Sequence, residues 1–207
     1  MTHREHVFKG EIASEHLVQL FDEPESRAEG VAEFLYTGWQ SASTLLVVAR
    51  PSHWAFIATR LEARGCPVAQ TIADGRLIVL DAATTLASCM VDGQPDSVRF
   101  QETIGAAVAR ICEKHELPYV YGEMVDILAG EGQLDAAQQL EALWNTLGSQ
   151  RSFTLLCGYS SAHFTDPQAA AALKHVCELH SEASAPSNDL LARWLLSERR
   201  PRFHVDP

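Results

Sequence analysis

The chain has 207 residues, of which 46% are hydrophobic and 21% are charged, a composition that supports one large folded domain. Acidic residues outnumber basic ones by 27 to 16, so the formal net charge is −11. A surface of this sign repels phosphate backbones, which argues against direct nucleic-acid binding. No apolar run approaches the length of a membrane span, and the charged first 15 residues do not resemble a signal peptide. We therefore expect a cytoplasmic protein without a membrane partner.

Five cysteines are scattered along the chain without C-x-x-C spacing: Cys66, Cys89, Cys112, Cys157 and Cys177. An odd, dispersed set in a cytosolic protein is typical of free thiols. We expect most of them to be buried.

Short apolar runs alternate with longer amphipathic stretches, the pattern of βαβ units around a parallel sheet. In chain order, the sequence predicts a strand over 16–21, a helix over 28–39, a strand over 44–49, a helix over 51–65, a strand over 77–80, helices over 84–90 and 97–114, a strand over 118–121, a helix over 133–147, a strand over 153–157 and helices over 167–180 and 188–196. The second strand is apolar at every position, as a central strand must be when helices cover both faces. The prediction is a three-layer α/β fold with a mostly parallel sheet.

Nine segments between residues 16 and 181 follow one another in the order of a known family. They include TLLVVARPSH (44–53), GRLIVLDAATTL (75–86), YGEMVDIL (121–128), FTLLCGY (153–159) and VCELHS (176–181). Each segment alone is weak evidence for the family, but nine segments in the same order along the chain are specific evidence. The chain resembles the MEDS domain, the methanogen/methylotroph sensory domain named for a dichloromethane-responsive regulator. The corresponding division is an N-terminal extension (1–15), a sensory domain (16–181), and a linker, short helix and tail (182–207).

The resemblance implies a RecA/KaiC-like fold that has lost nucleotide hydrolysis. It also implies that a small organic molecule, such as a hydrocarbon derivative, is sensed without a cofactor. The residues after Ser181 leave no room for a kinase or a helix-turn-helix, so the output requires a separate partner. That partner is a kinase, an anti-sigma-type factor or a transcription regulator, and a homo-oligomer is a further expectation because KaiC-like folds stack into rings. The alternative to this non-catalytic module is a divergent nucleotide-binding or metal-dependent hydrolase.

The segment after the first strand, FDEPESRAEG (21–30), argues against ATP hydrolysis. A phosphate-binding loop needs glycines, whose backbone N–H groups face the phosphates, and a lysine that neutralises charge. This segment has no lysine and no glycine before Gly30, and it carries four carboxylates, from Asp22, Glu23, Glu25 and Glu29. Those carboxylates repel a triphosphate, so no Walker A loop is expected.

Four of the candidate ligand residues stand where strands end, because open α/β sheets bind ligands at the carboxyl ends of their strands, whereas His16 begins the first predicted strand. The candidates are Asp81, Tyr121, Glu123, Tyr159 and His16. Asp81 has a second interpretation as the N-cap of the helix over 84–90. Glu123 likewise has a second interpretation, as a glutamate in the first turn of a helix, where the helix dipole favours a negative charge. Tyr121 and Tyr159 each keep a hydroxyl that could orient a ligand.

Cys177 and His180 are weak candidates for a metal site, because their spacing of three places them on one face of the predicted helix. A zinc site needs three or four protein ligands. Cys157, His163 or His16 would have to approach from elsewhere in the chain. A cysteine within a helix is more often a buried hydrophobic residue, so the sequence predicts no metal site.

Overall fold

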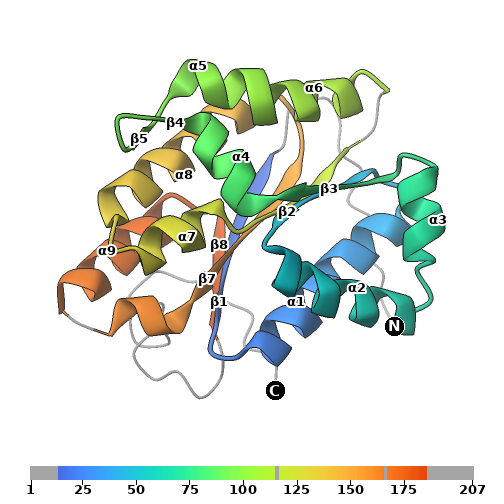
Figure 1. The fold of residues 1–207 in the computed structure, drawn as a ribbon, viewed down its shortest axis with the longest axis horizontal. Helices are drawn as coiled ribbons and strands as arrows, with labels where there is room; N and C mark the ends of the chain where they lie inside the picture. Colours follow the sequence, from blue (N-terminus) through green and yellow to red (C-terminus); the bar gives the residue numbers. More distant parts are fainter. Residues whose placement is uncertain (1–13, 115–116, 166, 186–207) are drawn as a thin grey trace.

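The computed structural model describes residues 14–114, 117–165 and 167–185. Its main sheet has six strands in the order β3-β2-β6-β7-β1-β8, and every neighbouring pair is parallel (Figure 1). The strands are β1 (Glu15–Phe21), β2 (Leu45–Ala49), β3 (Leu77–Asp81), β6 (Tyr119–Gly122), β7 (Thr154–Ser160) and β8 (Glu182–Ser184). Two short strands, β4 (Met90–Val91) and β5 (Gln94–Pro95), form a separate antiparallel hairpin. The predicted parallel sheet is confirmed.

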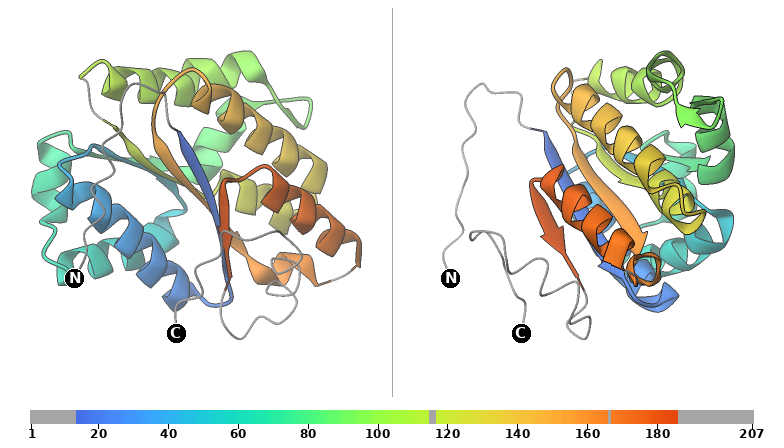
Figure 2. Two further views of the ribbon diagram at one scale, coloured as in Figure 1. Left: turned by 180° about the vertical axis from the view of Figure 1, so that it is seen from behind. Right: turned by 90° about the vertical axis from the view of Figure 1, so that its left-hand side faces the viewer.

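Helices cover both faces of the sheet. On one face lie α1 (Pro24–Gln40), α2 (Pro51–Ala63) and α3 (Val68–Ala73). On the other lie α4 (Ala82–Cys89), α5 (Ser97–Phe100), α6 (Ala106–Cys112), α7 (Met124–Gly130), α8 (Leu134–Gly148) and α9 (Pro167–Glu178). The views in Figures 1 and 2 agree that the sheet separates α1 and α2 from α6 and α8. The predicted three-layer α/β fold is therefore confirmed.

Strand β2 shows why the sheet needs both helix layers. Its side chains alternate, so Leu45, Val47 and Ala49 contact the α1–α2 layer. Leu46 and Val48 contact the opposite layer. All five residues are buried, so this strand has no face left for water.

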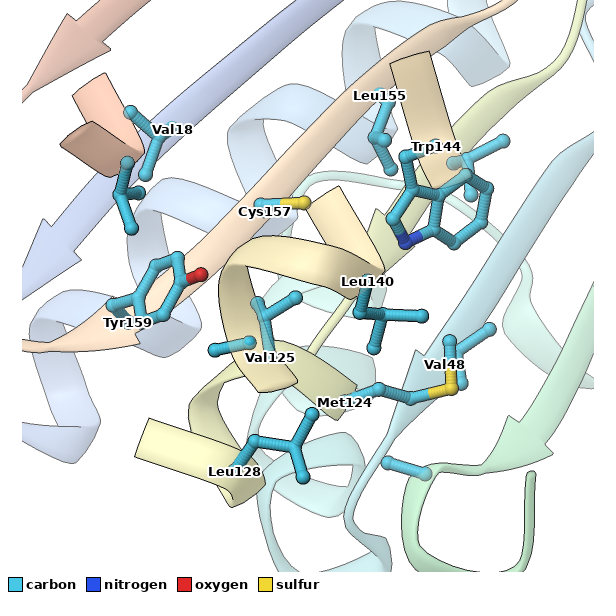
Figure 3. Close-up of a cluster of buried hydrophobic side chains, with 14 of the residues drawn as sticks. Val18, Val48, Met124, Val125, Leu128, Leu140, Trp144, Leu155, Cys157 and Tyr159 are labelled. Carbon is cyan, nitrogen blue, oxygen red and sulfur yellow. The ribbon is translucent and has the colours of Figure 1, made fainter. Parts of the chain in front are cut away.

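The larger core lies between the sheet and the α7–α8 layer. Trp144 of α8 meets Phe100 and Phe153 edge-on, with 5.2 and 6.0 Å between the ring centroids. Figure 3 shows Leu155 and Cys157 of β7 projecting into this core. The five cysteines are free and four of them are buried, as the sequence predicted. No described helix combines enough length with enough hydropathy to cross a bilayer.

The predicted helix over 97–114 is interrupted. A π-helical segment, η1 (Gln101–Gly105), separates α5 from α6. The fifth strand also differs, because β7 continues through the expected turn at 158–159 to Ser160. Its extension is paired with β1, where Phe21 stands opposite Ser160. A one-turn 3-10 helix, η2 (Ser161–Phe164), follows it.

Residues 182–184, which the sequence places in the predicted linker, form β8 at the edge of the sheet. Ser181 aligns this strand, because its N–H and hydroxyl both donate to the carbonyl of His16, at 2.7 and 2.8 Å. The predicted helix over 188–196 and residues 1–13 of the predicted extension lie outside the described residues.

Gly38 of α1 packs directly on the ring of Tyr119 in β6. A Cβ atom at position 38 would lie 2.5 Å from Tyr119 Cγ, so Gly38→Ala forces the helix and strand apart. We expect a loss of about 1–3 kcal/mol in the free energy of unfolding by urea. In a Tyr119→Ala background the same change should cost nothing or stabilise by up to about 1 kcal/mol, because alanine favours helix over glycine. An equal loss in both backgrounds would contradict this packing.

Candidate functional site

The crevice between β2 and β6 is the natural ligand position of this sheet. The helices that follow these neighbouring strands leave toward opposite faces, α2 toward one core and α7 toward the other. In open α/β sheets such a divergence opens a crevice at the carboxyl ends of the strands. Arg50 follows β2 directly and Glu123 follows β6 directly.

A pocket of about 270 Å³ opens at this edge, and we call it the edge pocket. Its lining comes from the segments after β1, β2, β6 and β7: Phe21, Asp22, Glu23, Pro24, Arg27, Arg50, His53, Asp126, Ser160 and His163. The volume is below the roughly 300–1,000 Å³ of sites for drug-sized ligands. The edge pocket therefore suits a small molecule.

Beneath the edge pocket lies the carboxylate–arginine cluster of Arg27, Arg50, Glu123 and Asp126. Glu123 is fully buried, and both of its carboxylate oxygens are bonded. Its Oε1 accepts a hydrogen bond from the Tyr121 hydroxyl at 2.9 Å. Its Oε2 accepts from the backbone N–H of Arg50 at 3.0 Å and lies 3.4 Å from Arg50 Nη1. His53 Nδ1 lies 3.0 Å from the same oxygen.

Asp126 joins the two arginines to the end of β7. Its Oδ2 accepts from Arg50 Nη1 at 2.7 Å and from Arg27 Nη2 at 3.4 Å. Its Oδ1 accepts from the Ser160 N–H at 2.6 Å and lies 3.2 Å from His163 Nε2. Burial alone would raise the pKa of Asp126, but its bonds with His163 and the arginines outweigh burial and hold that pKa far below its usual range.

Three side chains of this region retain contact with solvent and face the edge pocket. Arg50, His53 and His163 keep 29%, 25% and 24% of their side-chain surface exposed. Arg27 is buried, stacked 5.1 Å from the Phe21 ring centroid. The two guanidinium groups balance the two carboxylates of the cluster, and Asp22 and Glu23 add two further carboxylates to the lining, so arginines do not outnumber carboxylates around the edge pocket.

A second polar group, the histidine–glutamate cluster, is buried between the sheet and α8. It contains His16, Glu141, Cys157, Tyr159 and His180, from β1, α8, β7 and the turn after α9. Glu141 Oε1 accepts from the Tyr159 hydroxyl at 2.8 Å, and Oε2 accepts from Cys157 Sγ at 3.3 Å. The ring centroids of His16 and His180 lie 3.9 Å apart.

Burial dominates the acid–base chemistry of this cluster. It raises the pKa of the Cys157 thiol and of the Tyr159 hydroxyl well above their usual values, and the Glu141 carboxylate adds to both shifts. Burial would also raise the pKa of Glu141, but His180 and His16 lower it below its usual range. Glu141 is therefore an anion in the protein interior.

Comparison with known families identifies this architecture. The family model MEDS, described as MEthanogen/methylotroph, DcmR Sensory domain, matches residues 15–181. The chain belongs to the MEDS family. A search of curated proteins finds no match. Both polar clusters and the edge pocket lie inside the MEDS domain, whereas β8 begins one residue after it.

The MEDS domain brings some of the predicted site residues together and separates others. Tyr121 and Glu123 contact each other beside the edge pocket, whereas His16 and Tyr159 belong to the histidine–glutamate cluster. Both tyrosine hydroxyls donate to buried carboxylates, and their contact with a ligand stays a prediction. Asp81 lies apart on the edge strand β3, and its Oδ1 accepts from the Thr84 N–H at 2.7 Å. Its N-cap interpretation is confirmed.

The predicted pairing of Cys177 and His180 on one helical face is wrong. Helix α9 ends at Glu178, so His180 lies in the turn beyond it. There His180 meets His16 and Glu141, while Cys177 is not among the residues whose ligand atoms converge.

Four polar residues at the heart of the MEDS domain were not predicted: Arg27, Arg50, Asp126 and Glu141. Glu141 carried a signal, because its spacing from Ala137 and Trp144 places it on the buried face of α8. Arg50 directly follows the most apolar strand, which placed it at the ligand edge of the sheet. For Arg27 and Asp126 the sequence offered no comparable signal.

Asp126→Asn tests whether the carboxylate–arginine cluster is held by charge. Removing one partner of a buried ion pair leaves the arginines under-compensated, so we expect a loss of roughly 2–4 kcal/mol in unfolding free energy at pH 7. The folded-state pKa of Asp126 is depressed. Its stabilisation is therefore present above the ordinary carboxyl pKa of about 4 and is lost as the pH falls below it.

The measurement is urea unfolding of wild type and variant between pH 7 and pH 3. The difference in unfolding free energy between wild type and variant should stay constant down to about pH 5 and then become smaller. Asp135→Asn, at an exposed position in the first turn of α8, is the matched control and should change stability little at any pH. A gap for Asp126→Asn that does not vary with pH would rule out a charge-based role.

Proposed function

We propose that this MEDS domain is a non-catalytic sensory module that binds a small, oxygen-bearing organic molecule in the edge pocket. The observation that carries the proposal is the placement of Arg50, His53 and His163. All three face a small pocket at the switch point of the sheet, and two buried carboxylates hold them there. Hydrogen-bonding groups that are fixed in advance bind a polar ligand group without the entropic cost of ordering flexible side chains.

The lining indicates the chemical class of ligand. Phe21 and Pro24 supply apolar wall, Arg50 supplies N–H donors, and His53 and His163 supply the ring nitrogens that do not face Glu123 and Asp126. A short alcohol, aldehyde or carboxylate has one apolar end and one oxygen end that match these walls. This class agrees with the hydrocarbon derivatives that the family resemblance implies.

The connection between β1 and α1 supports a non-catalytic role. Only Asp22 and Glu23 separate the end of β1 from the start of α1, too few residues for a phosphate-wrapping loop. The Ser26 hydroxyl donates to Asp22 Oδ1 at 2.8 Å, so the start of α1 is bonded to its own acidic turn. Glu123 is a poor general base, because both of its oxygens are bonded and fully buried.

The walls of the edge pocket come from both helix layers. Arg27 and His53 belong to α1 and α2, whereas Asp126 and His163 belong to α7 and η2. A ligand that contacts both layers favours the conformations in which they are closest, and so shifts the population. We infer that a separate regulatory protein, such as a kinase, an anti-sigma-type factor or a transcription regulator, responds to that shift.

Binding can be tested with a panel of short alcohols, aldehydes, carboxylates and halogenated hydrocarbons, with ATP included. Compounds that raise the melting temperature are then titrated by calorimetry. His53→Ala and His163→Ala should each weaken binding about tenfold, the loss expected for one hydrogen bond to a polar ligand. ATP turnover that disappears in Glu123→Gln would instead support the hydrolase alternative.

A second pocket provides the matched control. It has a volume of about 570 Å³, lies between β3, α4 and α6, and includes Arg110 in its lining. Arg110→Gln should leave affinity unchanged. The proposal is overturned if no compound shifts the melt, or if Arg110→Gln abolishes binding while both histidine variants keep it.

A further inference from the structure

Four side chains from distant parts of the sequence converge in the histidine–glutamate cluster. His16, Glu141, Cys157 and His180 each offer one ligand atom, and these atoms lie within 4.8 Å of one another. All four residues are buried. The cluster is separate from the edge pocket, so its chemistry does not depend on the proposed ligand.

The tautomer of each histidine follows from its neighbours. Asn145 donates from Nδ2 to the carbonyl of Leu179 at 2.9 Å, so its Oδ1 is the atom that faces His16 Nδ1, also at 2.9 Å. His180 Nδ1 lies 2.6 Å from the carbonyl of Val176. Both oxygens can only accept, so each Nδ1 carries a proton, and in the neutral imidazole each Nε2 then presents a lone pair.

Both lone pairs point at an anion. His16 Nε2 lies 3.2 Å from Glu141 Oε2, and His180 Nε2 lies 3.4 Å from Glu141 Oε1. Among the described residues, His180 Nε2 has no hydrogen-bond partner, although it is buried. Acceptors that face one another without water are unfavourable unless a cation lies between them.

We propose that His16 Nε2, His180 Nε2, Cys157 Sγ and a carboxylate oxygen of Glu141 bind a divalent metal ion of the zinc class. Zinc accepts nitrogen, sulfur and oxygen ligands together, whereas magnesium and calcium select oxygen. Binding requires the Cys157 thiol to release its proton to solvent, and the resulting thiolate then coordinates the ion.

Three of the four ligand atoms, His16 Nε2, Cys157 Sγ and Glu141 Oε2, have the spacing expected around a tetrahedral ion. Bonds of about 2.0–2.3 Å place the corners of a tetrahedron about 3.3–3.7 Å apart. Cys157 Sγ lies 3.3 Å from both His16 Nε2 and Glu141 Oε2. The bonds from His16 and His180 to an amide and a carbonyl oxygen are the usual outer contacts of metal-binding histidines, since they fix the ring orientation.

Four protein ligands close the coordination shell, so the site is structural. The ion would join β1, β7 and α8 to the turn that leads into β8. Its removal should therefore loosen the attachment of β8 and lower the melting temperature of the whole domain.

The experiment begins with elemental analysis of the full-length protein, purified without chelator from zinc-supplemented cells. We expect about one zinc ion per chain. Metal-free protein is then titrated with Co²⁺, whose tetrahedral complexes absorb in the visible and whose thiolate bonds absorb in the near ultraviolet. The wild type should show both absorptions, and Cys157→Ser should lose the thiolate absorption.

Cys112→Ser and His175→Ala are the matched controls, because these residues lie outside the cluster and His175 is exposed. Both should keep full metal content, while His180→Ala should lose most of it. Circular dichroism checks folding, and a failure of either cluster variant to fold leaves the wild-type stoichiometry and Co²⁺ spectrum to decide. The site is refuted if wild type carries no metal and binds neither Zn²⁺ nor Co²⁺, which would make the histidines imidazolium partners of Glu141. It is equally refuted if folded Cys157→Ser and His180→Ala retain full metal content.

Discussion

The ion pairs of the carboxylate–arginine cluster determine how the carboxyl edge of the sheet is organised. The cluster of one buried arginine, one partly exposed arginine and two buried carboxylates contributes little net stability, because desolvation offsets much of the attraction. Removing any one of them, however, leaves a buried charge without compensation, so the geometry is strongly specified. Glu123, which follows β6, accepts the backbone N–H of Arg50, which follows β2, and Asp126 accepts the backbone N–H of Ser160 in β7. Three strand ends are thereby held in register, and the exposed sides of the donors around the edge pocket are fixed in direction.

The two polar clusters share an arrangement around a buried glutamate but balance the charge of that glutamate differently. In each, a buried glutamate accepts a hydrogen bond from a strand tyrosine and lies beside histidine. Glu123 also has a permanent cation, Arg50, whose Nη1 lies 3.4 Å from its Oε2. Glu141 has no arginine or lysine among its described contacts, and its charge must be balanced by protonated imidazoles or by a metal. Adjacent residues of β7 serve the two clusters, since Tyr159 donates to Glu141 and Ser160 donates to Asp126. A displacement of this strand end would therefore change the hydrogen bonds of both clusters.

The sequence predicted the sheet well because its strongest signal is local. Residues 45–49 are apolar at every position, and that pattern requires helices on both sides. Strand β8 had no such signal, because three residues with one apolar side chain look like linker, and its position depends on the contact between Ser181 and His16. The site was predicted in part, since Glu123 and Tyr121 follow from the end of one strand. The sequence places Tyr159 in the same site as Tyr121, which is wrong because of the register between β6 and β7. Tyr121 stands opposite Leu156, three residues before Tyr159, and an odd offset places the two rings on opposite faces of the sheet. Register between strands is a tertiary property that no single segment encodes.

The short connection between β1 and α1 explains why this edge of the sheet presents side chains rather than backbone N–H groups. In nucleotide-binding α/β folds a glycine-rich loop and a helix N-terminus present backbone N–H groups to phosphate. Here α1 starts two residues after β1, which brings its first turns directly over the strand ends. Arg27 projects from there to Tyr121 and Asp126, so an internal guanidinium fills space that a phosphate would need. What is left is a small pocket whose exposed hydrogen-bonding groups belong to one arginine and two histidines rather than to backbone amides. In the proposed function, selectivity would come from hydrogen bonds to a small polar group, while the acidic turn of Asp22 and Glu23 disfavours highly charged anions.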